Sequence, residues 1–222
     1  MVRTLVLPAY NEEKHIADMV RRSAPHVDHV IVIDNCSSDG TLREARQAGA
    51  ITLHHCVNLG KAGSLKTGCE MALKLGSDVI AFMDSDGQHE PEDLPRFFRV
   101  LEEERLDIVI GRRADLRTMP PIRKLGTTLI ALATKLLFKI DVKDVQSGFR
   151  VFRANIYEKI KWNSTGSAHY FADAEITARV GLAGLPCKEI EIRTIYHDKY
   201  KGMNALQGLN LLWRVFFWRL VF

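Results

Sequence analysis

Short apolar runs alternate with longer amphipathic stretches through the first half of the chain. The apolar runs are rich in valine and isoleucine, as buried strands are, and they cover residues 5–7, 30–33, 51–53, 79–83 and 108–110. The stretches between them have the apolar spacing of helices and cover residues 12–23, 41–48, 62–75 and 91–104. Strand and helix in alternation predict an α/β fold: a doubly wound, mainly parallel sheet with helices on both faces. In such sheets ligands bind beyond the carboxyl ends of the strands.

The alternation of strand-like and helix-like segments changes after Gly111. A basic segment with two adjacent prolines leads to an expected helix over residues 125–140 and a turn and strand over residues 144–152. A helix over 172–182, a strand over 188–195 and an apolar helix over 206–222 are expected to follow. The second half therefore has its own architecture and is expected to serve a different ligand from the first.

Composition and charge narrow the class of protein. The 222 residues are 46% hydrophobic and 26% charged, which suits one packed domain, and the net charge of +4 gives no reason to expect nucleic-acid binding. The basic residues cluster in two segments, which suits phosphate-bearing ligands or anionic lipid. These residues are Arg112, Arg113, Arg117, Arg123 and Lys124, then Lys199, Lys201, Arg214 and Arg219. The four scattered cysteines form no CxxC pair and are expected to be reduced, and no signal peptide is expected ahead of the first strand.

Two aspartates follow the fourth apolar run. Asp84 and Asp86 are spaced i, i+2 at a strand end, where they can converge on one hard cation, and Gln88 is a further oxygen donor. Mg²⁺ and Mn²⁺ favour such ligands and share them with substrate phosphates. The same residues would also suit a solvated turn or a helix cap, so the pair alone does not decide between these interpretations.

The three strands before this pair also end in polar or glycine-rich loops. The loops read PAYNEE at 8–13, DNCSSDGT at 34–41 and NLGKAG at 58–63. Their small residues let a ligand approach the backbone, Lys61 can meet a phosphate, and Asp34 can hold a base or ribose edge. One such loop is typical turn chemistry. Four at the same sheet edge indicate a ligand site.

Together these motifs resemble the donor-binding half of family 2 glycosyltransferases, which have the GT-A fold. The second half is most like the dolichyl-phosphate mannose and glucose synthases of that family, through GRR at 111–113, DVQSGFR at 144–150 and FADAE at 171–175. The resemblance covers nearly the whole chain. It implies a catalytic domain at 1–205, with a nucleotide-sugar half at 1–111 and an acceptor half at 112–205, followed by an amphipathic interfacial helix at 206–222.

The resemblance also implies roles for individual residues. The nucleotide would be lined by Pro8, Tyr10, Glu12, Asp34 and Lys61. The metal, Mg²⁺ or Mn²⁺, and the diphosphate it binds would be held by Asp84, Asp86 and Gln88. The acceptor phosphate would be bound by Arg112 and Arg123, and Thr127 is a further candidate. Arginine presents forked donors suited to phosphate oxygens.

The implied reaction moves a sugar from a nucleotide diphosphate donor onto dolichyl or polyprenyl phosphate with inversion. The best guess for the donor is GDP-mannose, and UDP-glucose is the alternative. The acceptor phosphate is already anionic, so it needs no strong base; if one is used, Asp144 and Glu175 are the candidates.

Two departures and three rival functions accompany this prediction. The QxxRW motif of processive synthases is absent, and HDKYKGMN at 197–204 replaces the usual RxxGxSK, so either Lys199 or Lys201 is expected to contact donor phosphate. The rivals are a soluble glycosyltransferase acting on a sugar or protein hydroxyl, a nucleotidyltransferase and an inactive binding subunit. The first loop lacks the glycine-rich signature of a nucleotidyltransferase, and the intact DSD with its arginines argues against an inactive subunit.

Two helices are expected to meet a membrane. The segment 206–222 would span about 25 Å as a helix, short of the ~30 Å hydrocarbon core, and it carries Arg214 and Arg219. Its Trp213 and Trp218 suit the headgroup boundary. On the helix 125–140 one apolar face is predicted from Leu125, Leu129, Leu132, Leu136 and Ile140. The prediction is a peripheral, monotopic protein on the cytoplasmic face of the cell membrane; alternatively, both helices cover the catalytic core.

Overall fold

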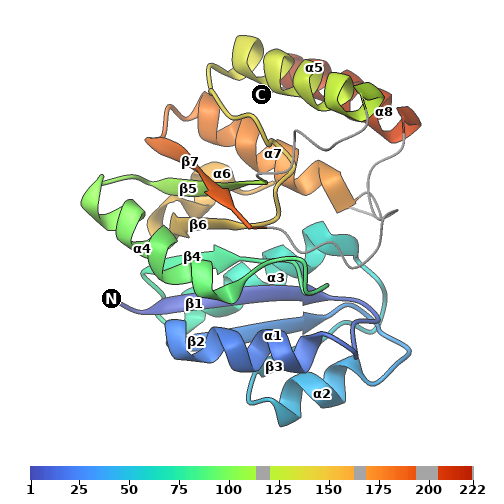
Figure 1. Cartoon of the computed structure of the whole chain (residues 1–222), viewed down its shortest axis with the longest axis vertical. Helices are drawn as coiled ribbons and strands as arrows, with labels where there is room; N and C mark the ends of the chain where they lie inside the picture. The colour runs from blue at the N-terminus through green and yellow to red at the C-terminus, as the bar shows by residue number, and fades with distance from the viewer. Residues whose placement is uncertain (114–120, 163–168, 194–204, 222) are drawn as a thin grey trace.

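The computed structural model describes residues 1–113, 121–162, 169–193 and 205–221, apart from a few side chains at the helix ends beside the gaps. A mixed sheet of seven strands, in the order β3-β2-β1-β4-β6-β5-β7, runs through this part of the chain (Figure 1). Only β6 is antiparallel to its neighbours among these seven strands. The strands are β1 (Arg3–Ala9), β2 (His29–Asp34), β3 (Ile51–His54), β4 (Val79–Phe82), β5 (Ile108–Arg113), β6 (Arg150–Arg153) and β7 (Cys187–Ile192).

Helices cover both faces of the sheet, as the alternating pattern predicts. They are α1 (Ile16–Ser23), α2 (Thr41–Gln47), α3 (Gly60–Lys74), α4 (Leu94–Glu103), α5 (Pro121–Phe138), α6 (Tyr157–Ile160), α7 (His169–Leu182) and α8 (Ala205–Val221). Short 3₁₀ turns are η1 (Ala24–His26), η2 (Pro91–Asp93) and η4 (Ala154–Ile156). The buried side chains divide accordingly: α1 and α4 share one apolar cluster with the sheet, while α3, α5, α6, α7 and α8 share the other.

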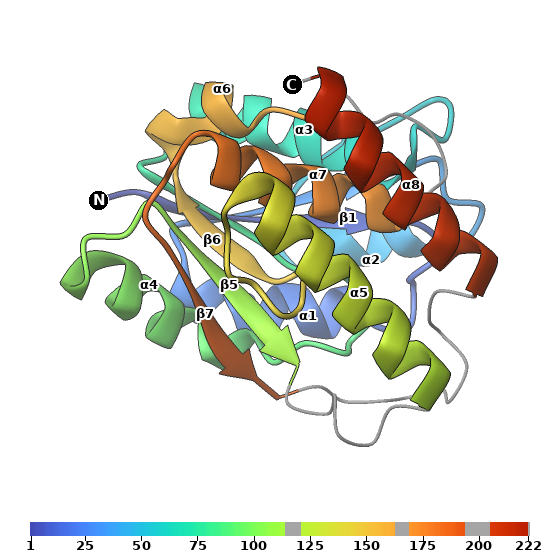
Figure 2. The same cartoon turned by 90° about the horizontal axis from the view of Figure 1, so that it is seen from above.

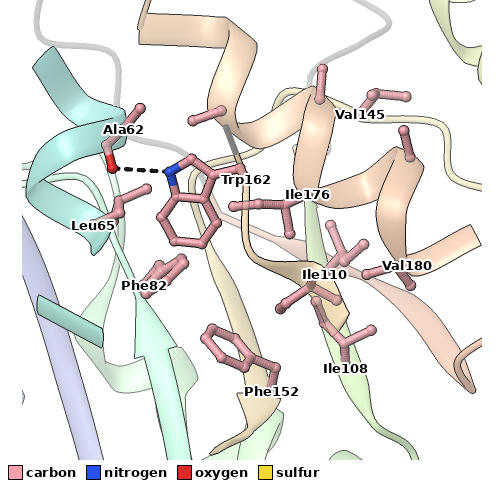
Figure 3. Close-up of a cluster of buried hydrophobic side chains, with 14 of the residues drawn as sticks. Ala62, Leu65, Phe82, Ile108, Ile110, Val145, Phe152, Trp162, Ile176 and Val180 are labelled. Atoms are coloured by element: carbon pink, nitrogen blue, oxygen red, sulfur yellow. Dashed lines mark hydrogen bonds between the residues drawn. The ribbon is translucent and has the colours of Figure 1, made fainter. Parts of the chain in front are cut away.

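The second cluster anchors the start of α3 to the second half of the chain. Figure 3 shows Trp162 inserted between Leu65 and Phe82 on one side and Ile176 on the other. The indole Nε1 donates a hydrogen bond of 3.0 Å to the carbonyl oxygen of Ala62, in the first turn of α3. A buried tryptophan with its N–H satisfied contributes a large apolar area without leaving an unpaired donor. This contact fixes the position of the residue just before Ala62, which is Lys61.

The predicted turn and strand over 144–152 are both present: Ser147 N donates to Asp144 O in the turn, and the strand covers Arg150–Arg153. The helix expected over 125–140 ends at Phe138, where Lys139 adopts a left-handed φ of 56°. Ile140 therefore lies beyond the helix and is buried in the core, so its assignment to the exposed apolar face was wrong.

The helices α5 and α8 lie side by side as an outer layer over α7 (Figure 2). Each buries one side against the core, through Ile130, Ala133 and Phe138 on α5 and through Leu211, Val215 and Trp218 on α8. Trp218 is thus a core residue, and its predicted place at a headgroup boundary was wrong. Each helix also exposes an apolar row, which we name the outer apolar face: Leu125, Leu129, Leu132, Leu136, Trp213, Phe216, Phe217 and Leu220. Among the described helices, none is long and apolar enough to cross a bilayer.

Candidate active site

The loops that follow β1, β2, β3 and β4 gather at one edge of the sheet, where the arrowheads of these parallel strands point the same way (Figure 1). Direct hydrogen bonds join the first two loops: Asn11 N donates to Ser37 Oγ at 3.0 Å, and Ser38 N donates to Asn11 Oδ1 at 2.9 Å. The first and fourth loops are joined by Ser85 Oγ, which donates to Pro8 O at 2.7 Å. The first, second and fourth predicted loops are therefore directly connected.

The residues predicted to line the nucleotide have different surroundings. Tyr10 is exposed, whereas Glu12 is partly buried and its N–H donates to Thr41 Oγ1 at 2.8 Å. Asp34 is buried at the end of β2; its Oδ2 lies 2.7 Å from His54 Nδ1, and its Oδ1 accepts the N–H of Ser37 at 3.3 Å. His54 thus holds the Asp34 carboxylate in one orientation. Sequence reasoning did not assign His54, although it follows the third apolar run directly.

A second polar network lies beside Asp34. Asn35 Oδ1 accepts the N–H of Leu59 at 2.9 Å and lies 3.0 Å from His55 Nδ1, while Asn35 Nδ2 donates to Asn58 Oδ1 at 2.8 Å. Burial lowers the pKa of His55, with a contribution from the neighbouring His54. These bonds tie the loop after β2 to the loop that begins α3, so the turn carrying Lys61 is held at both ends.

Lys61 lies between two carboxylates from distant parts of the chain. Its Nζ is 2.6 Å from Asp84 Oδ1, after β4, and 2.9 Å from Asp173 Oδ2, on α7. The side chains of Lys61 and Asp173 are 11% and 1% exposed, whereas that of Asp84 is 33% exposed. Burial opposes the charge of Lys61, but Asp173 and Asp84 outweigh it and raise the lysine pKa above its usual value. Lys61 is therefore a fixed cation at the strand-end edge.

The two acids respond differently to their surroundings. Burial raises the pKa of Asp173, although Lys61 and Arg150 oppose the rise. For Asp84 burial acts in the same direction, but Lys61 and His89 prevail and hold its pKa well below the usual range. Asp84 therefore stays negatively charged, as it must to bind a metal ion or to pair with Lys61.

Asp86 and Gln88 complete the predicted metal site. Both are partly exposed, and Asp86 Oδ1 accepts the backbone N–H of Gln88 at 3.1 Å. The described residues hold no group of three or more His, Cys, Asp or Glu side chains suited to a metal. Mg²⁺ and Mn²⁺ at phosphate-transfer sites need only one or two carboxylates, since substrate oxygens complete the shell. A partly exposed Asp86 beside an anionic Asp84 fits that donor set.

One segment, residues 144–150, connects this acidic centre to the basic end of β5. Arg113 donates to both carboxylate oxygens of buried Asp144, at 2.8 and 2.9 Å. A Cβ added to Gly148 would lie 2.2 Å from Asp84 Oδ2, so only glycine lets the segment approach this closely. Arg150 then reaches Asp173, as described below. The DVQSGFR motif is therefore a bridge between the two halves of the site.

The two arginines at the end of β5 have distinct partners. Arg112 Nη2 lies 3.0 Å from Glu191 Oε2 in a partly exposed pair, which stabilises the fold little and can yield to a phosphate. Arg113 is instead committed to Asp144. Arg123 lies in the first turn of α5, but its side chain is outside the described residues, as are Arg117, His197, Lys199 and Lys201. Thr127 is partly buried in the second turn of α5.

The two candidate bases are both buried and ion-paired. Asp144 is bound by Arg113, and Glu175 Oε1 lies 3.0 Å from Arg179 Nε on the same helix. The acid that approaches Lys61 and Asp84 is Asp173, which the FADAE motif contains but which sequence reasoning gave no role. Asp173 lies two residues before Glu175, so the two side chains point to different faces of the helix. This spacing was the sequence signal that Asp173 and Glu175 meet different partners.

Comparison with known proteins identifies the class. The family model described as glycosyl transferase family 2 matches residues 4–161, and this chain belongs to that family. The protein is therefore a glycosyltransferase, and its sheet and helices have the GT-A fold. The likeness to Mycobacterium tuberculosis glucosyl-3-phosphoglycerate synthase, crystallised with Mn²⁺, UDP and glucosyl-3-phosphoglycerate, has a TM-score of 0.73 at 20% identity and covers 98% of this chain and 79% of that one.

Curated relatives align over nearly the whole chain. An uncharacterized protein of Methanocaldococcus jannaschii is 31% identical, covering 95% of this chain and 89% of its own length. The UDP-N-acetylglucosamine–dolichyl-phosphate N-acetylglucosaminyltransferase of Methanococcus voltae is 28% identical, covering 95% and 93%. The undecaprenyl-phosphate mannosyltransferase of Micrococcus luteus is 29% identical, covering 91% and 86%.

Proposed function

We propose that this glycosyltransferase moves a sugar from a nucleotide diphosphate donor onto a polyprenyl phosphate at a membrane surface, with a divalent metal. The observation that carries the proposal is the position of the outer apolar face on α5, the same helix whose first turn bears Arg123. Helix N-termini favour phosphate, and exposed leucines further along α5 favour a hydrocarbon chain or a lipid surface. The helix α5 thus suits both the phosphate group and the hydrocarbon chain of a lipid phosphate.

The relatives support the acceptor class and leave the sugar open. The named proteins of Methanococcus voltae and Micrococcus luteus act on dolichyl and undecaprenyl phosphate, but with N-acetylglucosamine and mannose respectively. Mannose from GDP-mannose is our first choice of donor, since the Mycolicibacterium smegmatis and Pyrococcus furiosus relatives are also named for mannose transfer to polyprenol or dolichol. UDP-glucose and UDP-N-acetylglucosamine are the donors to test beside it.

The reaction requires little proton transfer. An oxygen of the acceptor phosphate attacks the anomeric carbon, the bond to the donor diphosphate breaks, and the configuration inverts. A divalent metal bound by Asp86 and Asp84 would neutralise charge on the departing diphosphate. Lys61 would bind the same diphosphate, while Arg112 and Arg123 orient the incoming phosphate. The buried ion pairs of Asp144 and Glu175 favour this mechanism over one that uses either of them as a base.

We further propose peripheral binding at the cytoplasmic face of the membrane. Leu136, Trp213 and Leu220 are 71%, 72% and 85% exposed, and they belong to an apolar row on two adjacent helices. Apolar side chains on interfacial helices enter the boundary between headgroups and acyl chains, and nearby basic groups favour anionic lipid. The exposed Arg219 on α8 supplies such a group.

A direct assay tests the proposed function. The protein is incubated with Mn²⁺, a polyprenyl phosphate in vesicles, and labelled GDP-mannose, UDP-glucose or UDP-N-acetylglucosamine in separate reactions. We expect label in the lipid extract with one donor and loss of that product with EDTA. Transfer to a free sugar or peptide hydroxyl, with none to the lipid phosphate, would favour the soluble glycosyltransferase instead.

A further inference from the structure

Asp173 joins two buried cations that lie on either side of it. Its Oδ2 is 2.9 Å from Lys61 Nζ, and its Oδ1 is 3.5 Å from Arg150 Nη2, whose side chain is fully buried. Buried ion pairs of this kind are often no more stable than apolar side chains of the same volume, because charges lose their hydration. Stability of the fold is therefore a weak reason for this cluster, and a role in the reaction is the stronger one.

Asp173 is fixed to α7 and to Arg150 through its backbone as well as through its carboxylate. Arg150 Nη1 donates to the backbone oxygen of Asp173 at 3.1 Å, and Thr177 Oγ1 donates to the same oxygen at 2.9 Å. The next turn of α7 places Ile176 in the apolar cluster shown in Figure 3. Asp84, by contrast, follows β4 in a loop where its side chain is 33% exposed. Asp173 thus provides Lys61 with a fixed partner, and Asp84 provides an accessible one.

This asymmetry matters when the donor binds. When Asp84 also serves a divalent cation, its negative charge is shared between that cation and Lys61, so its attraction for Lys61 weakens. With Asp173 present, Lys61 retains an anion 2.9 Å away and stays at the strand-end edge. Without it, Lys61 would either remain on Asp84 and compete with the metal, or turn away from the diphosphate.

We propose that Asp173, fixed by Arg150, is a positioning residue that keeps Lys61 directed at the donor diphosphate after Asp84 engages the metal. The inference rests on the proposed function, since it assumes a metal-bound nucleotide diphosphate at this edge. It adds that donor affinity depends on an acid of the acceptor half, 112 residues away from Lys61 along the chain.

Simple electrostatics makes the opposite prediction for one variant. Asp173→Asn removes a negative charge beside an anionic ligand, so charge alone would strengthen binding of a nucleoside diphosphate. Positioning of Lys61 predicts weaker binding, because the lysine loses its fixed partner. The sign of the change therefore separates the two explanations.

The test is calorimetric titration of the whole protein with GDP and with UDP at saturating Mn²⁺. We expect Asp173→Asn to weaken binding of the preferred nucleotide by about 10-fold or more, a usual effect for a hydrogen bond to a charged group. Lys61→Met should weaken it at least as much, and the double variant should be no worse than Lys61→Met alone, because Asp173 acts through Lys61. Unchanged or tighter binding by folded Asp173→Asn, or additive losses in the double variant, would overturn the inference.

A second variant keeps the test decisive if Asp173→Asn does not fold. Asp173→Asn leaves Arg150 without its carboxylate, so thermal unfolding of each variant is measured first. If Asp173→Asn is unfolded, Asp173→Glu keeps the charge but displaces the carboxylate by one methylene; we expect it to fold and to bind the nucleotide more weakly. Binding equal to wild type by Asp173→Glu would contradict positioning. If wild type itself binds neither nucleotide, the proposed function fails and this inference fails with it.

Discussion

The strand-end centre and the α5–α8 layer use opposite means to prepare for a ligand. In the centre, Lys61, Asp84, Asp173 and Arg150 are charged groups that form ion pairs with one another inside the protein. In the layer, the outer apolar face carries large hydrophobic side chains that the described part of the chain leaves uncovered. The first arrangement suits a small, highly charged ligand that replaces internal ion pairs. The second suits an extended apolar surface that removes water from exposed side chains.

Because the two surfaces suit different ligands, a substitution in one surface should leave the function of the other intact. Changes in the centre should reduce every transfer reaction, whatever the acceptor. Changes in the layer should matter only when the acceptor is presented in a lipid surface. The predictions below test this separation, from the largest expected effect to the smallest.

Asp86→Ala should reduce transfer about 10²–10³-fold, the usual cost of losing one group that stabilises transition-state charge. The fold should survive, because Asp86 is partly exposed at a strand end. Steady-state rates at saturating Mn²⁺ measure the effect, with Glu103→Ala, an exposed acid on α4, as the control. Near-normal turnover of Asp86→Ala would remove this residue from the metal site.

Gly148→Ala should reduce transfer by up to about 10²-fold, the cost of a misplacement near 1 Å in an active site. The new Cβ would lie 2.2 Å from Asp84 Oδ2, so the carboxylate must move. Gly126→Ala on α5 is the matched control for the fold, since its Cβ meets nothing within 4 Å. Circular dichroism and rates are compared for both, and a fully active Gly148→Ala would show that Asp84 tolerates the shift.

Arg112→Ala should raise the KM for lipid phosphate about 10-fold, as loss of a charged hydrogen bond would. The KM for the nucleotide donor should change little, because Arg112 lies near the end of β5 and pairs with Glu191. Glu191→Ala is the informative companion, since it frees the guanidinium without removing it. Equal damage to both substrates by Arg112→Ala would assign the residue to the donor side or to the fold.

Trp162→Phe should lower the free energy of unfolding by about 1–2 kcal/mol and reduce transfer only slightly. It removes the 3.0 Å hydrogen bond to Ala62 O that fixes the turn next to Lys61. Denaturant unfolding measures the loss, with the exposed Trp213→Phe as the control expected to cost almost nothing. Equal stability of the two variants would show that the Ala62 contact contributes little.

The sequence predicted the fold and the gathering of the first four strand-end loops because their signals are local. Valine-rich runs and strand-end loops identify β1 to β4 and their carboxyl ends from neighbouring residues alone. The turn and strand from Asp144 onward were predicted, but the contacts of this segment with Arg113, Asp84 and Asp173 were not, because these partners are distant in the sequence. The role of Asp173 was hidden for the same reason.

The outer layer shows a second limit of local patterns. Spacing along α5 correctly grouped Leu125, Leu129, Leu132 and Leu136 as exposed, but it extended the face to Ile140. The left-handed turn at Lys139 ends the helix and turns Ile140 into the core, which periodicity cannot reveal. Likewise, Trp213 and Trp218 look alike in sequence, yet only packing against α5 and α7 distinguishes the exposed one from the buried one.

The buried residues of α8 also decide how the membrane contact is tested. Deleting residues 213–222 would remove Val215 and Trp218 from the core along with the exposed face. Replacing Leu136, Trp213 and Leu220 with serine changes only exposed side chains. Each replacement removes at most roughly 1.5–3 kcal/mol of apolar transfer to the interface. Leu73→Ser/Leu182→Ser, which changes exposed leucines on α3 and α7, is the matched control.

The most direct measurement compares two acceptors for this triple serine variant: a long polyprenyl phosphate in vesicles and a short, water-soluble prenyl phosphate. The account predicts that transfer to the vesicle-bound acceptor falls at least about 10-fold, in step with loss of vesicle binding in sedimentation, because apolar burial at the interface is removed. Transfer to the short acceptor should match wild type and the Leu73→Ser/Leu182→Ser control. Equal loss with both acceptors, or no loss with either, would contradict the separation between the charged centre and the lipid-facing layer.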